Sequence, residues 1–190
     1  MVPPLPNLSR PRATLADLAA VPEHEIGEII EGTLVTQPRP AAPHARATSR
    51  LGMDVGGPFD RGRGGPGGWI ILHEPELHLG PDVLVPDLAG WRRERMPELP
   101  DTSAFTLAPD WVCEVLSPAT QSRDRLLKMR IYGRERVTHA WLVDPVAQVL
   151  EVFRREGDLW LRTQSAGGNE TLRAEPFDAI ELELAALWER

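Results

Sequence analysis

Two acidic residues set among apolar neighbours, together with one lysine, are the side chains of this chain best suited to chemistry. Asp87 ends the apolar run Val83–Asp87, and Glu114 lies inside the run Trp111–Leu116. Alternation along a strand places each acid on the same face as apolar side chains. A buried, unpaired carboxylate is costly, so a cation, a raised pKa or exposure at the end of the strand must offset the burial.

Lys128 is the only lysine among the 21 basic residues of the chain. We predict a helix from about 119 to 136, in which Asp124, Lys128 and Tyr132 share one face because they are spaced i, i+4 and i+8. A turn between the strand of Glu114 and this helix would bring the first helical turns back beside the end of the strand. The lysine stem is long enough to reach a carboxylate cluster there.

Two strand carboxylates and a lysine meet the requirements of metal-assisted phosphodiester hydrolysis. Mg²⁺ prefers oxygen ligands and is commonly held by one or two carboxylates, water and the substrate phosphate. Such a metal neutralises charge on the phosphoryl oxygens and lowers the pKa of water. A compact ammonium can orient the attacking water or stabilise the developing charge. Lysine suits this role because it is a point charge whose pKa responds to its surroundings, unlike that of arginine.

Short strands and a few helices are the elements expected to position these residues. The order of strands, a helix and a further strand, with flanking hairpins, predicts an α/β (or α+β) domain built on one mixed sheet. Strands are predicted on both sides of the Glu31-Gly32 turn and over 69–74, 76–79, 83–89, 110–116, 140–143, 149–153 and 159–162, and helices over 14–20, 44–55, 119–136 and 179–188.

Length and composition restrict the class of protein. A chain of 190 residues suits one domain, expected over 14–190, preceded by a flexible Pro-rich arm over 1–13. No apolar run is long enough to cross a membrane, and a single cysteine excludes an internal disulfide framework and a four-cysteine zinc site. We therefore expect a cytoplasmic protein, and the Arg-, Ala-, Gly- and Pro-rich composition is typical of a GC-rich bacterial genome. The net charge of −7 argues against a protein that coats nucleic acid non-specifically.

The order and spacing of several short blocks resemble a known family. The blocks are Pro86-Asp87, Glu114-Val-Leu-Ser-Pro, Asp124-Arg-Leu-Leu-Lys128-Met-Arg-Ile-Tyr132 and Trp141-Leu-Val-Asp-Pro145, with Glu28-Ile-Ile-Glu31-Gly, Pro43-His44 and Glu74-Pro75 upstream. Over about residues 14–160 they resemble the Uma2 family of putative restriction endonucleases, which is placed in the PD-(D/E)XK nuclease superfamily.

The resemblance implies a restriction-endonuclease-like core in which Asp87 and Glu114 are metal ligands. The superfamily usually carries its lysine two positions after the second acid, but that position is Leu116 here. The resemblance therefore points to Lys128, on the following helix, as the source of the ammonium. It also makes Glu31, His44, Glu74 and Asp124 candidates for supporting roles.

The leading hypothesis from the sequence is a Mg²⁺- or Mn²⁺-dependent DNA endonuclease with Asp87, Glu114 and Lys128 as its catalytic residues. Such an enzyme would act on DNA, and a homodimer would suit cleavage of both strands. One alternative is a catalytically inactive binding or regulatory module on the same fold. Another is a pair of carboxyl groups acting as general acid and base on a sugar.

Overall fold

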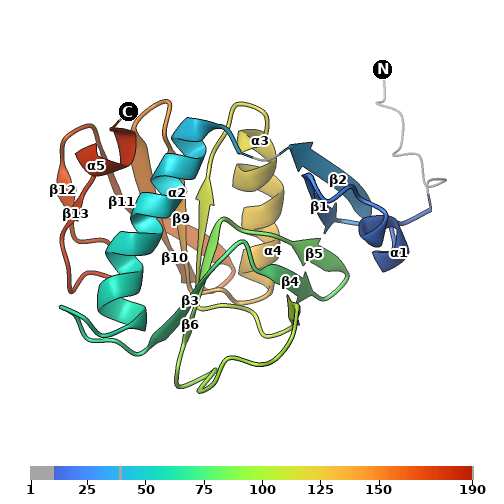
Figure 1. Ribbon diagram of the computed structural model, residues 1–190, viewed down its shortest axis with the longest axis horizontal. Coiled ribbons are helices and arrows are strands. Elements are labelled where there is room, and N and C mark those ends of the chain that lie inside the picture. Colours follow the sequence, from blue (N-terminus) through green and yellow to red (C-terminus); the bar gives the residue numbers. More distant parts are fainter. Residues whose placement is uncertain (1–10, 39, 190) are drawn as a thin grey trace.

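A six-stranded sheet forms the centre of the computed structural model, which describes residues 11–38 and 40–189 (Figure 1). The strand order is β11-β10-β9-β8-β6-β3, and only β8 and β9 of these neighbours run parallel. A parallel pair needs a crossover connection, which the helical segment between β8 and β9 supplies. The strands are β3 (Trp69–His73), β6 (Leu88–Arg92), β8 (Trp111–Val115), β9 (His139–Asp144), β10 (Val149–Glu156) and β11 (Leu159–Gly167).

A second sheet, of five strands in the order β2-β1-β5-β4-β7, contains the N-terminal hairpin. The turn of that hairpin has positive φ at Glu31 (51°) and Gly32 (80°), as two-residue turns that match strand twist require. Its strands are β1 (Glu25–Ile30), β2 (Thr33–Pro38), β4 (Glu76–Leu79), β5 (Asp82–Leu84) and β7 (Ala104–Phe105), and a small separate pair consists of β12 (Thr171–Leu172) and β13 (Leu182–Glu183).

Helices lie against both faces of the six-stranded sheet (Figure 1). Two of them contain π-helical segments, one continuing α2 and one inside the crossover. Among the described helices, none has both the length and the apolar character needed to span a bilayer. The helical segments are α1 (Leu15–Ala19), α2 (Ala42–Val55), η1 (Gly56–Asp60), α3 (Gln121–Arg123), η2 (Asp124–Lys128), α4 (Met129–Arg134) and α5 (Ala185–Trp188).

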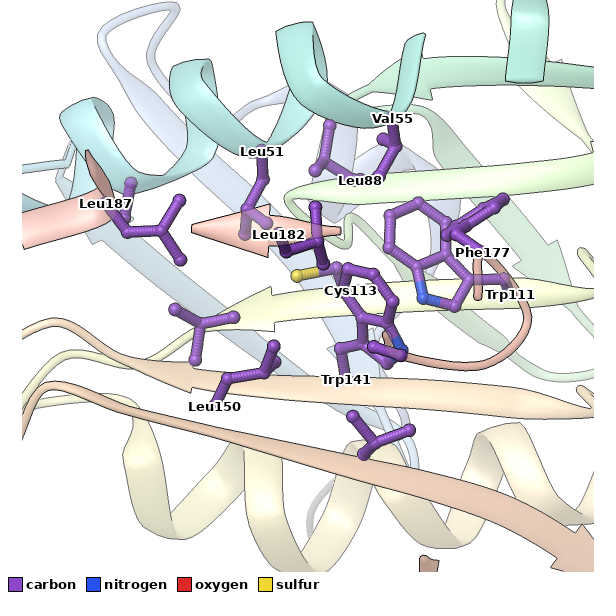
Figure 2. Close-up of a cluster of buried hydrophobic side chains, with 14 of the residues drawn as sticks. Leu51, Val55, Leu88, Trp111, Cys113, Trp141, Leu150, Phe177, Leu182 and Leu187 are labelled. Atoms are coloured by element: carbon purple, nitrogen blue, oxygen red, sulfur yellow. The ribbon is translucent and has the colours of Figure 1, made fainter. Parts of the chain in front are cut away.

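Two apolar cores result from the alternation of side chains along β8. Trp111 and Cys113 face α2, where they contact a core that includes Leu51 (Figure 2). Val112 belongs to the other core, together with Tyr132 of α4. Every residue of β8 is buried, so Glu114, which lies on the face of Val112, enters the interior on the side of the crossover helices.

The fold class predicted from the sequence is confirmed as a mixed α+β arrangement, but two details of the prediction are wrong. A single strand over 83–89 was expected, whereas β5 ends at Leu84 and β6 begins at Leu88, in different sheets. Pro86 explains the break, because proline cannot donate to a ladder inside a sheet. This division also gives two main sheets in place of one.

The elements near the two chain termini agree only in part with the sequence-based expectation. The predicted C-terminal helix over 179–188 is reduced to α5, because residues 182–183 form β13. At the other end, the helix predicted over 14–20 is α1, which begins with a capping box formed by Thr14 and Asp17. Most of the flexible arm expected over 1–13 lies outside the described residues.

Substitution of Phe177 tests the core beneath α2. Its ring lies 4.6 Å from that of Phe59, 4.9 Å from that of Trp69 and 4.8 Å from that of Trp111, between ring centroids. We expect Phe177→Ala to lower the free energy of unfolding by about 3–5 kcal/mol in urea denaturation, because it leaves a cavity among these rings. Leu159→Ala, at a side chain that is 75% exposed, should change it by less than about 0.5 kcal/mol. Equal effects of the two substitutions would contradict this packing.

Candidate active site

A cavity of about 240 Å³ lies beside the end of β8, between the first turn of α2 and the start of α3. It brings together most of the residues that the sequence singles out as chemical candidates. The candidates that line it are His44, Glu74, Asp87, Glu114, Asp124 and Lys128. They come from α2, from the segments that follow β3 and precede β6, from β8 and from η2. The fold therefore gathers residues that are far apart in the sequence.

Asp87 lies in the short segment that leads from the five-stranded sheet to the six-stranded one. Its Oδ2 accepts a hydrogen bond of 2.7 Å from the backbone N–H of Val115. Its Oδ1 lies 3.2 Å from Nε2 of His44. These contacts fix the carboxylate of Asp87 against the end of β8, next to Glu114.

Glu114 is a buried acid with only 3% of its surface exposed. Its Oε1 accepts a 2.5 Å hydrogen bond from the Tyr132 hydroxyl and lies 2.8 Å from Nζ of Lys128. Burial raises the pKa of Glu114 well above its ordinary value. The charge of Lys128 opposes this rise, while the neighbouring acids Asp124, Asp87 and Glu28 add to it.

Lys128 places its ammonium at the back of the cavity, where the side chain is 1% exposed. Besides Glu114, Nζ contacts Oε1 of Glu28 at 2.9 Å and donates to the carbonyl of Val85 at 3.3 Å. Burial lowers the pKa of this lysine, but the charges of Glu114 and Glu28 outweigh burial and raise the pKa above its ordinary value. Lys128 is therefore a charged ammonium despite its burial.

Glu28 is a member of the cluster that the sequence analysis did not single out. It lies on β1 and is 1% exposed. Its Oε1 accepts from the backbone N–H of Val85 at 2.8 Å, and its Oε2 has no hydrogen-bond partner among the described residues. Glu28 follows Gly27, so the local sequence signal is weaker than for Glu114, and its burial depends on the pairing of β1 with β5.

Glu31 lies outside the cavity. It occupies the turn between β1 and β2, where its side chain is 47% exposed and pairs with Arg130 at 3.1 Å. Its backbone N–H donates to Oδ1 of Asp82 at 2.6 Å. The structure therefore gives Glu31 contacts to α4 and β5 rather than a place beside Asp87 and Glu114.

His44, Glu74 and Asp124 complete the cavity wall. Burial lowers the pKa of His44, but the hydrogen bond and charge of Asp87 outweigh burial, so the net direction is upward. Burial raises the pKa of Asp124, against the opposing charge of Lys128. Glu74 is exposed, has a positive φ of 45°, and donates its backbone N–H to the carbonyl of Asp87 at 3.1 Å.

The helix that carries Lys128 changes to π-helical geometry where it passes the cavity. Over η2 the backbone N–H of Met129 donates to the carbonyl of Asp124, which is the i→i+5 bond of a π-helix. Asp124 and Lys128 are buried, whereas Leu126 between them is 68% exposed. The wider turn thus presents both charged side chains to the interior, at the kind of helical irregularity that is frequent at functional sites.

The donor set of the cavity fits a hard divalent cation. Carboxylates outnumber basic groups there, since Glu74, Asp87, Glu114 and Asp124 line the cavity with His44 and Lys128, and burial raises the pKa of Glu114 and Asp124. Within residues 11–38 and 40–189, no three His, Cys, Asp or Glu side chains are arranged to hold a metal by themselves. Mg²⁺ is usually bound by one or two carboxylates, and water and a substrate phosphate complete its coordination.

Comparisons with known proteins identify a matching family and a similar solved structure. The model of the Uma2 family, described as "Putative restriction endonuclease", matches residues 14–186, which confirms the resemblance drawn from the sequence. Among solved structures, the chain is similar to the crystal structure of a putative nuclease belonging to DUF820 from Anabaena variabilis ATCC 29413. The two are 24% identical with a TM-score of 0.75, over 93% of this chain and 97% of that chain, so the likeness shows the fold. A search of curated proteins finds no match.

A double-mutant cycle tests the buried ion pair of Lys128 and Glu28. We expect Lys128→Met alone to lower the free energy of unfolding by about 3–5 kcal/mol, because it leaves buried carboxylates without their cation. Adding Glu28→Gln should recover at least about 1 kcal/mol of that loss, because it removes a buried carboxylate that would retain only the more distant cation Arg123, at 3.8 Å. The measurement is urea denaturation at neutral pH.

The matched control is the exposed pair of Arg130 and Glu31, whose side chains are 61% and 47% exposed. The cycle of Arg130→Met and Glu31→Gln should give a coupling energy below about 1 kcal/mol. A coupling energy between Lys128 and Glu28 no larger than this control would show that the buried contact is absent in solution.

Proposed function

The chain belongs to the Uma2 family of putative restriction endonucleases, and from this premise we propose that it is a metal-dependent DNA endonuclease that hydrolyses phosphodiester bonds. One observation carries the proposal. Asp87, Glu114 and Lys128, which come from the β5–β6 connection, β8 and η2, line the same cavity. That combination of two carboxylates and an ammonium is suited to phosphodiester hydrolysis.

Asp87 and Glu114 are the residues that would hold Mg²⁺ or Mn²⁺. Both supply oxygen donors, and the hydrogen bonds from Val115 and Tyr132 orient their carboxylates. When bound, the cation would neutralise charge on the phosphoryl oxygens and lower the pKa of water. His44 would act as a positioning residue, because its Nε2 contacts Oδ1 of Asp87 at 3.2 Å.

Lys128 would stabilise the negative charge that develops on the phosphoryl group. Its ammonium remains charged in the cavity wall, where the surroundings exclude most water and electrostatic interactions are strong. Glu28, on β1, would keep the lysine in place, since its Oε1 lies 2.9 Å from Nζ. A homodimer would supply the two sites needed to cut both strands of a duplex.

A second candidate function is a catalytically inactive binding module on the same fold. The observation that favours it is that every N–H donor of the Lys128 ammonium already has a partner. An ammonium has three donors, and Nζ already contacts Glu114, Glu28 and the carbonyl of Val85. In such a module the cluster would stabilise the fold, and neither metal binding nor hydrolysis would follow.

Plasmid nicking distinguishes the two candidates. We expect the purified chain to convert supercoiled DNA to the open circular form with Mg²⁺ or Mn²⁺ and to lose this activity in EDTA. Asp87→Asn and Glu114→Gln should each lower the rate on the order of 100-fold, because each removes a metal ligand. Glu181→Gln, at an acid that is 60% exposed, is the control and should retain the wild-type rate. Nicking that survives both cavity substitutions would come from another site or a contaminant.

Metal binding can be measured without DNA. In isothermal titration calorimetry with Mn²⁺, we expect one site on the wild type and on Glu181→Gln, and loss of that site in Asp87→Asn and Glu114→Gln. The physical reason is the removal of a charged oxygen donor from a pair that has no third protein ligand among the described residues. A wild type that binds no metal and cuts no DNA would support the inactive module.

A further inference from the structure

A second cavity, of about 800 Å³, opens on the other side of the first turn of α2. Its wall is formed by that turn, by the connection between β9 and β10, and by α5. We propose that this cavity binds an unstacked base of the DNA strand whose phosphate occupies the catalytic cavity. The inference rests on the proposed function and adds a substrate preference to it.

The two cavities share one turn of helix. Ala41 and His44 line the catalytic cavity, whereas Ala42, Pro43 and Arg46 line the second. In Figure 1 the start of α2 lies between α3 on one side and α5 on the other. A strand that crosses this helical turn would therefore meet both cavities in succession.

The sheet fixes how far apart the two cavities are. β8 and β9 are parallel neighbours with Val115 opposite Val143, and both end at the same edge of the sheet. Pro145, which lines the second cavity, follows Val143 by two residues. With strands about 5 Å apart and a rise of about 3.3 Å per residue, Pro145 lies roughly 8 Å from Val115. Successive nucleotides of a stacked strand rise about 3.4 Å, so a base two or three positions from the reacting phosphate can reach the cavity.

The chemistry of the second cavity suits a nucleobase. Its walls include Pro145, Leu187 and Trp188, and the indole N–H of Trp188 donates to the carbonyl of Gly168 at 3.0 Å, which fixes the ring. Bases stack on such surfaces without strong sequence preference. Arg46 and Glu189, which pair at 3.5 Å on the same wall, offer polar groups to the edge of a base. A volume of about 800 Å³ is within the range of small-molecule sites.

The proposal predicts a preference for DNA whose bases are already unstacked. Taking a base out of a paired duplex has an energetic cost, which a single-stranded or bulged substrate avoids. The phosphate contacts of the catalytic cavity would be the same for both kinds of DNA. Binding should therefore depend on the presence of the base itself and not only on the charge of the backbone.

The test compares the binding of a fluorescein-labelled single-stranded oligonucleotide with that of an abasic strand of equal length. Binding is measured by fluorescence anisotropy with Ca²⁺ present. We expect the wild type to bind the normal strand about tenfold more tightly than the abasic strand. Val146→Glu, at a cavity residue that is 73% exposed, should reduce this ratio to about twofold or less. Leu159→Glu adds the same charge at a residue that is 75% exposed and lies at the far end of the β10–β11 hairpin, so it should keep the wild-type ratio.

A cross-link gives an independent readout. A strand that contains 5-iododeoxyuridine, irradiated on the full chain, should attach to Trp188, and Trp188→Leu should abolish that adduct in mass spectrometry. Circular dichroism verifies that each variant is folded.

Base-independent binding, or equal ratios in Val146→Glu and Leu159→Glu, would overturn the base site while leaving the proposed function intact. Failure to bind either strand would overturn the base site, while plasmid nicking tests the proposed function separately. A change of oligomeric state in Val146→Glu without a change in the ratio would reassign the cavity to contact between two copies.

Discussion

The buried ammonium of Lys128 between two carboxylates is the interaction on which the rest of the structure depends. Glu28 reaches it from the N-terminal hairpin and Glu114 from the central sheet, at 2.9 Å and 2.8 Å from Nζ. An unpaired charge at such a depth would be unfavourable by several kcal/mol, so β1, β8 and η2 must meet at this point for the fold to be stable. The same requirement places Glu114 and Asp87 at one cavity. The charged groups that stabilise the fold are thus the same groups that the proposed chemistry requires.

Residues from both main sheets surround this cluster. Pro86 interrupts the ladder, and the chain passes from one sheet to the other through Asp87, so the acid is held at the junction instead of inside a strand. The parallel pair of β8 and β9 ends at the same edge, and the crossover helix returns over it. Both cavities described above lie at this edge, separated by the first turn of α2.

Much of this arrangement could be predicted from the sequence, because acids inside apolar runs and a lone lysine on a helical face are local signals. Glu114 and Lys128 were selected in this way, and the structure places them in contact. Glu28 was missed, because its burial depends on the pairing of β1 with β5, which no local pattern records. Glu31 is a candidate only through the family resemblance, and it lies beside a turn, where acids are ordinarily solvated. The split of the strand at Pro86 was also missed. The alternation of apolar side chains continues across Pro86, but the strand that pairs with this segment changes.

We propose that Asp87 and Glu114 together hold one divalent cation in the cavity beside Lys128. The most direct measurement is a crystal structure of the chain soaked in Mn²⁺, with anomalous diffraction collected at an energy where manganese scatters strongly. The account predicts a single strong anomalous peak within coordination distance of a carboxylate oxygen from each of the two acids. A well-ordered cavity without a peak under saturating Mn²⁺, or a peak bound only elsewhere on the molecule, would contradict it.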